Sequence, residues 1–434
     1  CQEWHCKARN WQPFEVPPAS AKAVLLTHAH VDHCGLLPKL VKDGFSGRIY
    51  CTAATAEIAA IALLDSAKIQ EEDTAFKKKR HEHEGRKGPY PEIPLYTVED
   101  AEATIPLFKT IQYGEQVPLN AGIEAVFHDA GHILGASIIK LKLAINGTRR
   151  TILFSGDIGR RDRPIIQDPS QIEIADYVVV ESTYGDRLHE DPSLIPDKLA
   201  EVVNSTFRAG GNIVVPAFAI ERAQEILYTL NELLIQGRIP RLIVLLDSPM
   251  AARVTEVFKE HPELYDQKMR DRIREGRSPF EFPGLVTIQS VEDSKAINNL
   301  KGTCMIIAGS GMASGGRIKH HLVANISRPE STILFVGYQS PGTLGRQLVD
   351  GATEVRILGQ MRPVRARVVQ LGGFSAHADR DELMAWLGGL KRAPRRVFVT
   401  HGEETVSKAF AEHLRARTGW EVFVPQYMDE VILD

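Results

Sequence analysis

The sequence predicts an α/β protein of two domains, one of them inserted into the other, and three observations point to this fold class. The chain has 434 residues, which is more than one hydrophobic core usually serves. Its first half alternates short β-branched runs with glycine-marked turns, whereas strands and helices alternate from about residue 192 onwards. Residues with the same kind of metal-binding chemistry stand on both sides of that alternating segment, which therefore looks inserted.

The first part of the chain is predicted to consist mostly of strands. Short apolar runs bounded by turn residues favour this structure. Such runs lie at residues 23–27, 122–127, 137–143, 151–154 and 177–181. A stretch without glycine or proline predicts one long helix over residues 52–84. His81 and His83 within this helix are residue types that bind metals. Residues two apart face different sides of a helix, however, so we do not expect them to share a metal ion.

The middle of the chain is predicted to be a parallel-sheet α/β domain, because continuous apolar runs are typical of strands covered on both faces. The expected strands are residues 212–215, 242–246, 305–308 and 332–336, and the expected helices are residues 221–234 and 250–260. After them come an apolar run at residues 366–371, a helix over 379–387, a strand at 396–400 and a last helix from Glu403. We therefore assign residues 1–190 and 366–434 to one domain and residues 191–365 to the inserted domain.

The composition limits the kinds of partner that this protein can have. The formal net charge is −3, so the chain lacks the excess of basic residues that is typical of a protein that binds nucleic acid with its whole surface. Any polyanion site must therefore be a local patch, although a solvated face is the usual explanation of a charge run. Basic runs lie at residues 77–80, 160–163 and 362–367. No run approaches the roughly 18 apolar residues of a membrane span, so we expect no membrane partner.

The cysteines are few, odd in number and in no metal-binding or redox spacing. They are Cys1, Cys6, Cys34, Cys51 and Cys304. This pattern argues against a disulfide framework and favours a reducing compartment, so we expect a cytoplasmic protein. Cys34 follows a histidine cluster, and we interpret it as a small buried packing residue rather than as a ligand or nucleophile.

Four potential metal ligands crowd into six residues directly after the first predicted strand. They are His28, His30, Asp32 and His33. Burying such side chains unpaired would cost several kcal/mol, so the cluster is no ordinary core feature. Alternate residues can point to two sides, so His28 and His30 can serve one ion while Asp32 and His33 serve another. Neutral imidazole and carboxylate suit zinc.

Three further residues end strands in the way that a two-metal site needs. They are His132, Asp157 and His401, and each has a glycine beside it that lets the backbone approach a metal closely. Taken singly, a structural role is the more frequent explanation for His132 or His401. Together with the first cluster, they favour metal ligation.

These motifs resemble those of a known superfamily. The His-Ala-His-Val-Asp-His cluster, His132 and Asp157 look like the metal motifs of the metallo-β-lactamase superfamily. Glu181, in Val-Val-Glu-Ser-Thr-Tyr-Gly, His377, in Gly-Gly-Phe-Ser-Ala-His, and His401 look like the three extra motifs of the β-CASP nucleases. The resemblance is strongest to the cleavage-and-polyadenylation endonuclease type and runs from about residue 20 to the end. It implies an αββα metallo-β-lactamase sandwich with an inserted parallel-sheet β-CASP domain.

The resemblance also implies two zinc ions and their ligands. One ion would be held by His28, His30 and His132, the other by Asp32, His33 and His401, with Asp157 between them. Two dications would lower the pKa of water enough to supply a nucleophile at neutral pH, and they would neutralise charge on the phosphate. Asp32 then serves both as a ligand and in catalysis.

Cleavage of a phosphodiester also needs a proton for the departing sugar oxygen. We expect His377 to be that general acid, with Glu181 holding and charging its ring, and a structural polar role is the alternative for each. The glycine-rich run at residues 309–317 can form a nest of amides for a phosphate, or merely a tight turn. The candidate substrate contacts are Ser310, Gly311, Arg317 and Ser375.

The predicted function is therefore hydrolysis of single-stranded RNA by a zinc-dependent ribonuclease in RNA processing or decay. The chain ends soon after the last predicted strand, without the additional C-terminal domain of related exonucleases, which favours endonucleolytic cleavage. The oligomeric state stays open, with a homodimer as one outcome.

Three alternatives compete with this function. A small-molecule hydrolase of the superfamily would share the metal ligands but would have no reason for the inserted domain or His377. DNA-directed β-CASP nucleases typically carry valine where His401 stands. A metal-free scaffold subunit would be expected to have lost ligands, whereas every ligand position is filled here.

Overall fold

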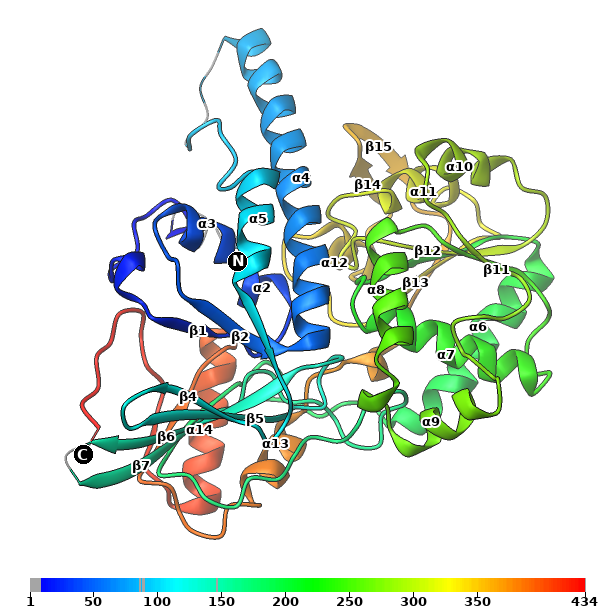
Figure 1. Ribbon diagram of the computed structural model, residues 1–434. Helices are drawn as coiled ribbons and strands as arrows, with labels where there is room; N and C mark the ends of the chain where they lie inside the picture. The colour runs from blue at the N-terminus through cyan, green and yellow to red at the C-terminus, as the bar shows by residue number, and fades with distance from the viewer. Residues whose placement is uncertain (1–8, 86, 88–89, 146, 434) are drawn as a thin grey trace. The chain divides into compact units, whose positions relative to one another are not determined.

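The chain divides into two compact units in a computed structural model that describes residues 9–85, 87, 90–145 and 147–433 (Figure 1). Cys1 and Cys6 lie outside the described residues. The first unit comprises Cys1–Gly159, Asp168–Asp186 and Glu382–Asp434, and the second comprises Arg160–Gln167 and Arg187–Asp381. The domain borders that the sequence suggests at residues 190 and 365 stay a prediction. Among the described helices, none combines the length and apolar character needed to cross a bilayer.

The described part of the first unit contains two sheets. The smaller is parallel throughout, in the order β1-β2-β3, with β1 Ala23–Leu25, β2 Arg48–Thr52 and β3 Phe108–Ile111. The larger has the order β18-β17-β8-β7-β6-β5-β4. Its strands are β4 Gln116–Asn120, β5 Ile123–Asp129, β6 Ser137–Ile145, β7 Thr148–Phe154, β8 Tyr177–Val180, β17 Arg396–Val399 and β18 Val422–Phe423. Strands β4 to β7 are antiparallel neighbours, whereas β7, β8, β17 and β18 run parallel.

Helices cover the two sheets of this unit. They are α2 Val31–Cys34, α3 Leu37–Lys42, α4 Ala53–Glu84, α5 Val98–Thr104, α13 Arg380–Leu387 and α14 Glu404–Thr418. Helix α4 packs on β2 and β3, and α14 packs on β17 and β18. The long helix α4 begins where the hydroxyl of Thr52 accepts a hydrogen bond from the amide of Thr55, and it ends at Gly85, whose φ of 61° is left-handed.

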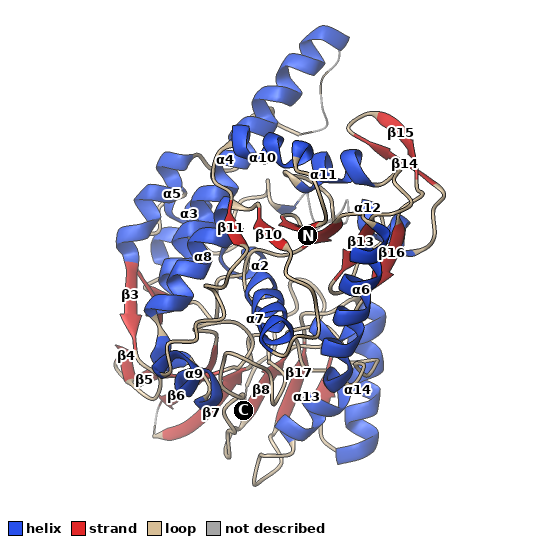
Figure 2. Ribbon diagram, turned by 90° about the vertical axis from the view of Figure 1, so that its right-hand side faces the viewer, coloured by secondary structure: helices blue, strands red, loops and turns tan. Residues whose placement is uncertain are grey.

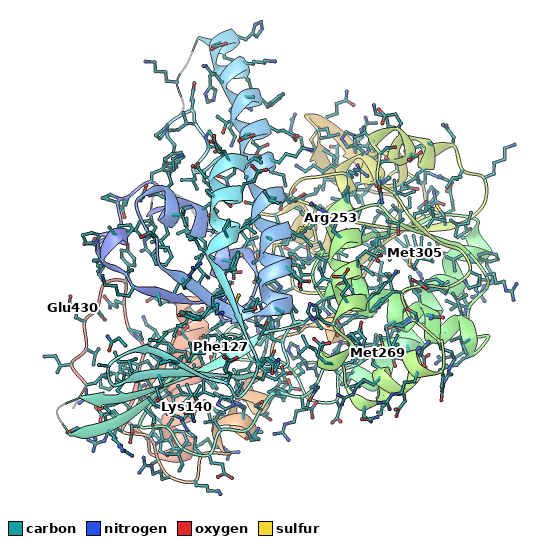
Figure 3. All side chains as sticks on the ribbon, viewed as in Figure 1. Phe127, Lys140, Arg253, Met269, Met305 and Glu430 are labelled. Carbon is teal, nitrogen blue, oxygen red and sulfur yellow. The ribbon has the colours of Figure 1, made fainter. Side chains whose placement is uncertain are left out.

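The core of the first unit lies between its two sheets. Buried Ile111, Phe127 and Ile139 form one cluster, against which Leu25 and Tyr50 of the smaller sheet pack. Phe127 of β5 stands opposite Ile139 of β6, while Lys140, the next residue along β6, faces the other side of the sheet (Figure 3). This alternation is the period-two pattern that marks strands in the sequence.

The second unit is built on one six-stranded parallel sheet in the order β11-β10-β12-β9-β13-β16. Its strands are β9 Ile213–Pro216, β10 Ile243–Leu246, β11 Leu285–Thr287, β12 Cys304–Ala308, β13 Thr332–Phe335 and β16 Arg367–Gln370. The unit also contains a separate antiparallel hairpin, which consists of β14 Glu354–Ile357 and β15 Gln360–Pro363. Strands β9, β12 and β13 are buried along their whole length, as their continuous apolar sequences predict.

Helices lie on both faces of this parallel sheet. They are α6 Ile195–Ala209, α7 Arg222–Ile235, α8 Pro249–Glu260, α9 Gln267–Arg274, α10 Val291–Ala296, α11 Ile318–Asn325 and α12 Leu344–Val349. Helices α6 and α7 lie on one face, whereas α10 and α11 lie on the other (Figures 1 and 2). The predicted α/β fold class is confirmed, with two sheets in the described part of the first unit and a separate six-stranded parallel sheet in the second.

Each strand and helix expected from the sequence is present, with ends shifted by at most three residues. The run at residues 366–371 becomes β16, which pairs with β13 as the edge strand of the parallel sheet. The short strands β2, β3, β4 and β11 and the hairpin of β14 and β15 were not predicted, because runs of three to five residues carry little periodic signal. Cys34 is fully buried and free, as expected, and burial raises the pKa of its thiol to about 12.

Ile306 allows a test of the parallel sheet as the core of the second unit. It lies in the middle of β12 at 1% exposure, and its buried cluster includes Val214 and Ile333. The change Ile306→Ala should lower the free energy of unfolding by about 2–5 kcal/mol, because it leaves a cavity among packed neighbours. Val286→Ala, at a side chain of the same sheet that is 45% exposed, should change it by less than about 0.5 kcal/mol. Urea unfolding followed by circular dichroism measures both, and equal midpoints would contradict this core.

Candidate metal centre

The predicted histidine cluster lies at a strand-to-helix turn of the first unit. His28 follows β1 and is completely buried, and His30 is the residue that precedes helix α2. Asp32 and His33 belong to the single turn of α2, whose amides bond back to His30 and Val31. The short turn therefore presents several ligand side chains within one tight bend of the chain.

His132 stands in a second tight turn, between β5 and β6. The amide of Ala130 donates to the carbonyl of Ala136 across this turn, and the carbonyl of Gly135 accepts from the hydroxyls of both Thr52 and Thr55. Gly135 has a φ of 79°, and a Cβ atom there would lie 2.6 Å from the Thr52 hydroxyl. The start of helix α4 thus fixes the turn that carries His132.

Parallel pairing brings the remaining first-unit residues to one edge of the larger sheet. Asp157 follows β7, Glu181 follows β8 and His401 follows β17, and these three strands are parallel neighbours. The carboxyl ends of parallel strands meet at the same edge, so residues far apart in the sequence lie together there. The amide of Ile158 donates to Glu181 Oε1 at 2.7 Å, which ties the second loop to the first.

One set of ligand atoms converges on a single point. His30 Nδ1 lies 3.1 Å from His28 Nε2 and 3.2 Å from His132 Nε2. Asp157 Oδ2 lies 3.3 Å from His28 Nε2 and 3.6 Å from His132 Nε2. Ligands about 2.0–2.1 Å from a tetrahedral zinc ion would be separated by about 3.3 Å, so this donor set fits zinc in size and chemistry.

A second set lies beside the first. His33 Nε2 is 3.1 Å from His401 Nε2, and Asp32 Oδ2 is 3.4 Å from His401 Nε2 and 4.0 Å from His33 Nε2. Asp157 adjoins this set too, with Oδ2 3.4 Å from His33 Nε2 and Oδ1 3.3 Å from His401 Nδ1. The structure therefore brings together the two ligand sets that the sequence suggests, with Asp157 next to both.

The electrostatics of the two sets differ. Burial lowers the pKa of His28, which favours the neutral imidazole that a metal ion needs. At His401, which is partly exposed, desolvation by the surrounding groups opposes protonation, but the carboxylates of Asp32 and Asp157 raise its pKa to about 9. A cation at the second set must therefore compete with a proton for this imidazole, so its affinity should increase with pH.

Glu181 lies next to the ligands but is held by the backbone. Glu181 is buried. One of its carboxylate oxygens, an oxygen of Asp157 and a ring nitrogen of His401 all lie within 4.8 Å of one another. The amides of Ile158 and Thr183 donate to its two oxygens, at 2.7 and 3.3 Å. Thr183, which the sequence interpretation passed over, also places its hydroxyl 3.3 Å from His401 Nδ1. The Glu-Ser-Thr run after β8 was the available signal for this supporting role.

The other candidate residues belong to the second unit. They are Ser310, Gly311, Arg317, Ser375 and His377. Arg317 donates to Asp247 Oδ1 at 2.6 Å and to the carbonyl of Gln289 at 2.7 Å, so its guanidinium has a structural role. Gly311 lies against the ring of Phe218, which a Cβ atom would meet at 2.7 Å. Their part in substrate binding stays a prediction.

The histidine pair of helix α4 does not form a metal site in the described residues. His81 is buried, with Nδ1 2.6 Å from Glu92 Oε1, whereas His83 is exposed. The expectation that the two rings face different sides of the helix agrees with this arrangement.

Comparisons with known proteins identify three regions of this chain. Residues 5–160 match the metallo-β-lactamase superfamily domain, residues 223–348 the β-CASP domain, and residues 361–425 the Zn-dependent metallo-hydrolase RNA specificity domain. A ribonuclease of Thermus thermophilus is 38% identical over 98% of this chain and 91% of its own length.

Two archaeal relatives from Methanocaldococcus jannaschii extend these comparisons. A transcription termination factor is 30% identical over 98% of this chain, which spans 66% of that longer protein. An RNase J-like protein is 29% identical over 95% of this chain and 89% of its own length.

Contact between two glycine turns sets the spacing of His132 and Asp157. A Cβ atom on Gly159 would lie 1.5 Å from the carbonyl oxygen of Gly131. Gly159→Ala should therefore push the His132 turn away from Asp157 and weaken zinc binding by roughly 10-fold to 100-fold, as loss of ligand support does elsewhere. Zinc titration with a competing chelator measures the affinity, and thermal unfolding controls for loss of the fold. A folded variant with the parent affinity would contradict this packing.

Proposed function

Because the chain belongs to the β-CASP ribonuclease family of the metallo-β-lactamase superfamily, we propose that it is a zinc-dependent ribonuclease that hydrolyses single-stranded RNA. One observation carries the proposal, namely that two ligand sets adjoin the shared carboxylate of Asp157. The match to an RNA specificity domain and the ribonuclease of Thermus thermophilus favour RNA over DNA.

We assign two zinc ions to this centre. His28, His30 and His132 would hold one, and Asp32, His33 and His401 would hold the other, with Asp157 between them. When bound, two such cations lower the pKa of water and stabilise negative charge on a phosphate. The carboxylates of Asp157 and Asp32 supply two negative charges that partly offset the positive charge of these cations. Burial of His28 lowers its pKa, which favours an unprotonated ligand nitrogen.

His377 is proposed as the general acid that gives a proton to the departing sugar oxygen. Histidine exchanges protons close to neutral pH, and protonation of a leaving group typically contributes about 100-fold to 10,000-fold in rate. The assignment rests on the resemblance of its motif. Glu181 is proposed to add negative charge near the reacting groups, held in place by the amides of Ile158 and Thr183.

The substrate contacts are proposed to come from the loops of the second unit. The loop at residues 309–317 is compact, since the amide of Ser310 donates to Gly315 and the amide of Ser314 to the Ser310 hydroxyl. Ser310, Gly311, Arg317 and Ser375 are the candidates for contacts with phosphate or sugar oxygens. We propose endonucleolytic cleavage, as the resemblance of the motifs to the cleavage-and-polyadenylation endonuclease type implies.

Two other activities remain as alternatives to this proposal. A DNA-directed nuclease of the same family would use the same metal ligands, but His401 stands with the second ligand set, where such enzymes typically carry valine. A small-molecule hydrolase would need neither the β-CASP domain nor the RNA specificity domain that this chain matches.

Cleavage of matched polymers tests the proposed function. The protein should cut 5′-end-labelled single-stranded RNA at internal positions and should cut DNA of the same sequence more slowly. A chelator should abolish cleavage, and added zinc should restore it, because the ligands alone supply no nucleophile. Gel analysis of product lengths provides the measurement. Equal cleavage of RNA and DNA would refute the RNA assignment, and release of single nucleotides from one end would replace the endonuclease by an exonuclease.

A further inference from the structure

We propose that His189, Arg160 and Arg163 are positioning residues that hold the main chain around Ser375 and thereby orient the His377 imidazole. The proposal rests on the proposed function, in which His377 is the general acid. All of these residues belong to the second unit, so the geometry lies within one compact body.

Two guanidinium groups hold the chain just before Ser375. The carbonyl of Gly373 accepts hydrogen bonds from Arg160 Nη1 at 3.1 Å and from Arg163 Nη1 at 3.0 Å. Gly373 itself fits closely, since a Cβ atom would meet the side chain of Ile195 at 2.7 Å. A carbonyl that accepts two charged donors has little freedom to rotate.

A buried carboxylate keeps Arg163 in place. Glu225 Oε1 accepts from Arg163 Nη2 at 2.6 Å and from its Nε at 3.2 Å, and Glu225 Oε2 accepts from Arg222 Nη1. Although burial opposes ionisation, the two arginines hold the pKa of Glu225 below its ordinary value. The Arg222 guanidinium also lies 5.9 Å from the centre of the Phe374 ring, on the residue before Ser375.

His189 holds the chain at His377 itself. Its Nε2 lies 3.0 Å from the main-chain carbonyl oxygen of His377, and a carbonyl can only accept, so the Nε2 nitrogen must donate. Burial and the charge of Arg160 lower the pKa of His189 to about 4, so the ring is neutral at pH 7 with its proton on Nε2. The amide of His189 donates to Asp379 Oδ2 at 2.9 Å, which fixes the chain beyond His377 as well.

These contacts fix the main chain on each side of the proposed acid without using its side chain. Proton transfer requires heavy atoms within about 2.6–3.2 Å, and a displacement of about 1 Å can cost on the order of 100-fold in rate. A loop with free carbonyls at Gly373 and His377 would sample many imidazole positions. The three positioning residues should therefore affect the turnover number rather than RNA binding.

Variants of His189 separate positioning from general stability. His189→Leu removes the Nε2 donor, whereas His189→Gln keeps an N–H donor on a shorter polar side chain. Arg163→Lys keeps a positive charge beside Glu225 but cannot also reach the Gly373 carbonyl. His83→Leu, at an exposed histidine of helix α4, is the matched control for the histidine-to-leucine change.

Two substrates separate proton donation from the rest of catalysis. Each variant is assayed with single-stranded RNA and with bis(p-nitrophenyl) phosphate, whose phenolate leaves without a proton at neutral pH. His189→Leu should lower kcat on RNA by about 100-fold, with little change in KM or zinc content and a smaller loss on the aryl diester. His189→Gln should recover most of that loss. Arg163→Lys should also lower the ratio of RNA cleavage to aryl diester hydrolysis. His83→Leu should match the parent protein in both activities.

The outcomes distinguish this inference from the proposed function. His377→Ala is the reference, and it should lower the ratio of RNA cleavage to aryl diester hydrolysis more than any positioning variant. If the parent fails to cut RNA, or His377→Ala leaves that ratio unchanged, the proposed function fails. A second result would contradict the positioning roles alone. In it, His377→Ala lowers the ratio as expected, but His189→Leu and Arg163→Lys either keep the parent ratio or lose both activities equally.

Discussion

The buried carboxylate of Asp157 is the feature on which the metal centre depends. Its two oxygens lie 3.3–3.6 Å from imidazole nitrogens of His28, His33, His132 and His401, which come from three separate turns of the first unit. A carboxylate at 2% exposure is costly unless positive charge compensates it. Cations bound by the surrounding imidazoles would supply that charge.

The sheet order determines which residues can surround this carboxylate. Strands β7, β8 and β17 are parallel neighbours although residues 181–395 separate the last two, so Asp157, Glu181 and His401 meet at one edge. Most of the second unit, Arg187–Asp381, lies between β8 and β17 in the sequence, and the two strands still pair. The pairing of β8 with β17 therefore does not require the two strands to be close in the sequence.

Local patterns in the sequence predict much of this arrangement. The apolar runs of β9, β12 and β13 predict buried parallel strands, and the histidine cluster with its neighbouring glycines suggests the ligand sets, because each signal lies within a few residues. The contacts between distant segments leave no such pattern. The salt bridge of Arg317 with Asp247 and the two arginines at the Gly373 carbonyl depend on pairings across 70 and more than 200 residues.

Anomalous diffraction at the zinc edge, from crystals grown with zinc, would locate the metal ions of this centre directly. We expect two zinc peaks, one bound by His28, His30 and His132 and the other by Asp32, His33 and His401. Each should lie about 2.0–2.2 Å from an oxygen of Asp157. A single peak, or two peaks that leave Asp157 uncoordinated, would contradict a two-metal centre organised around this carboxylate.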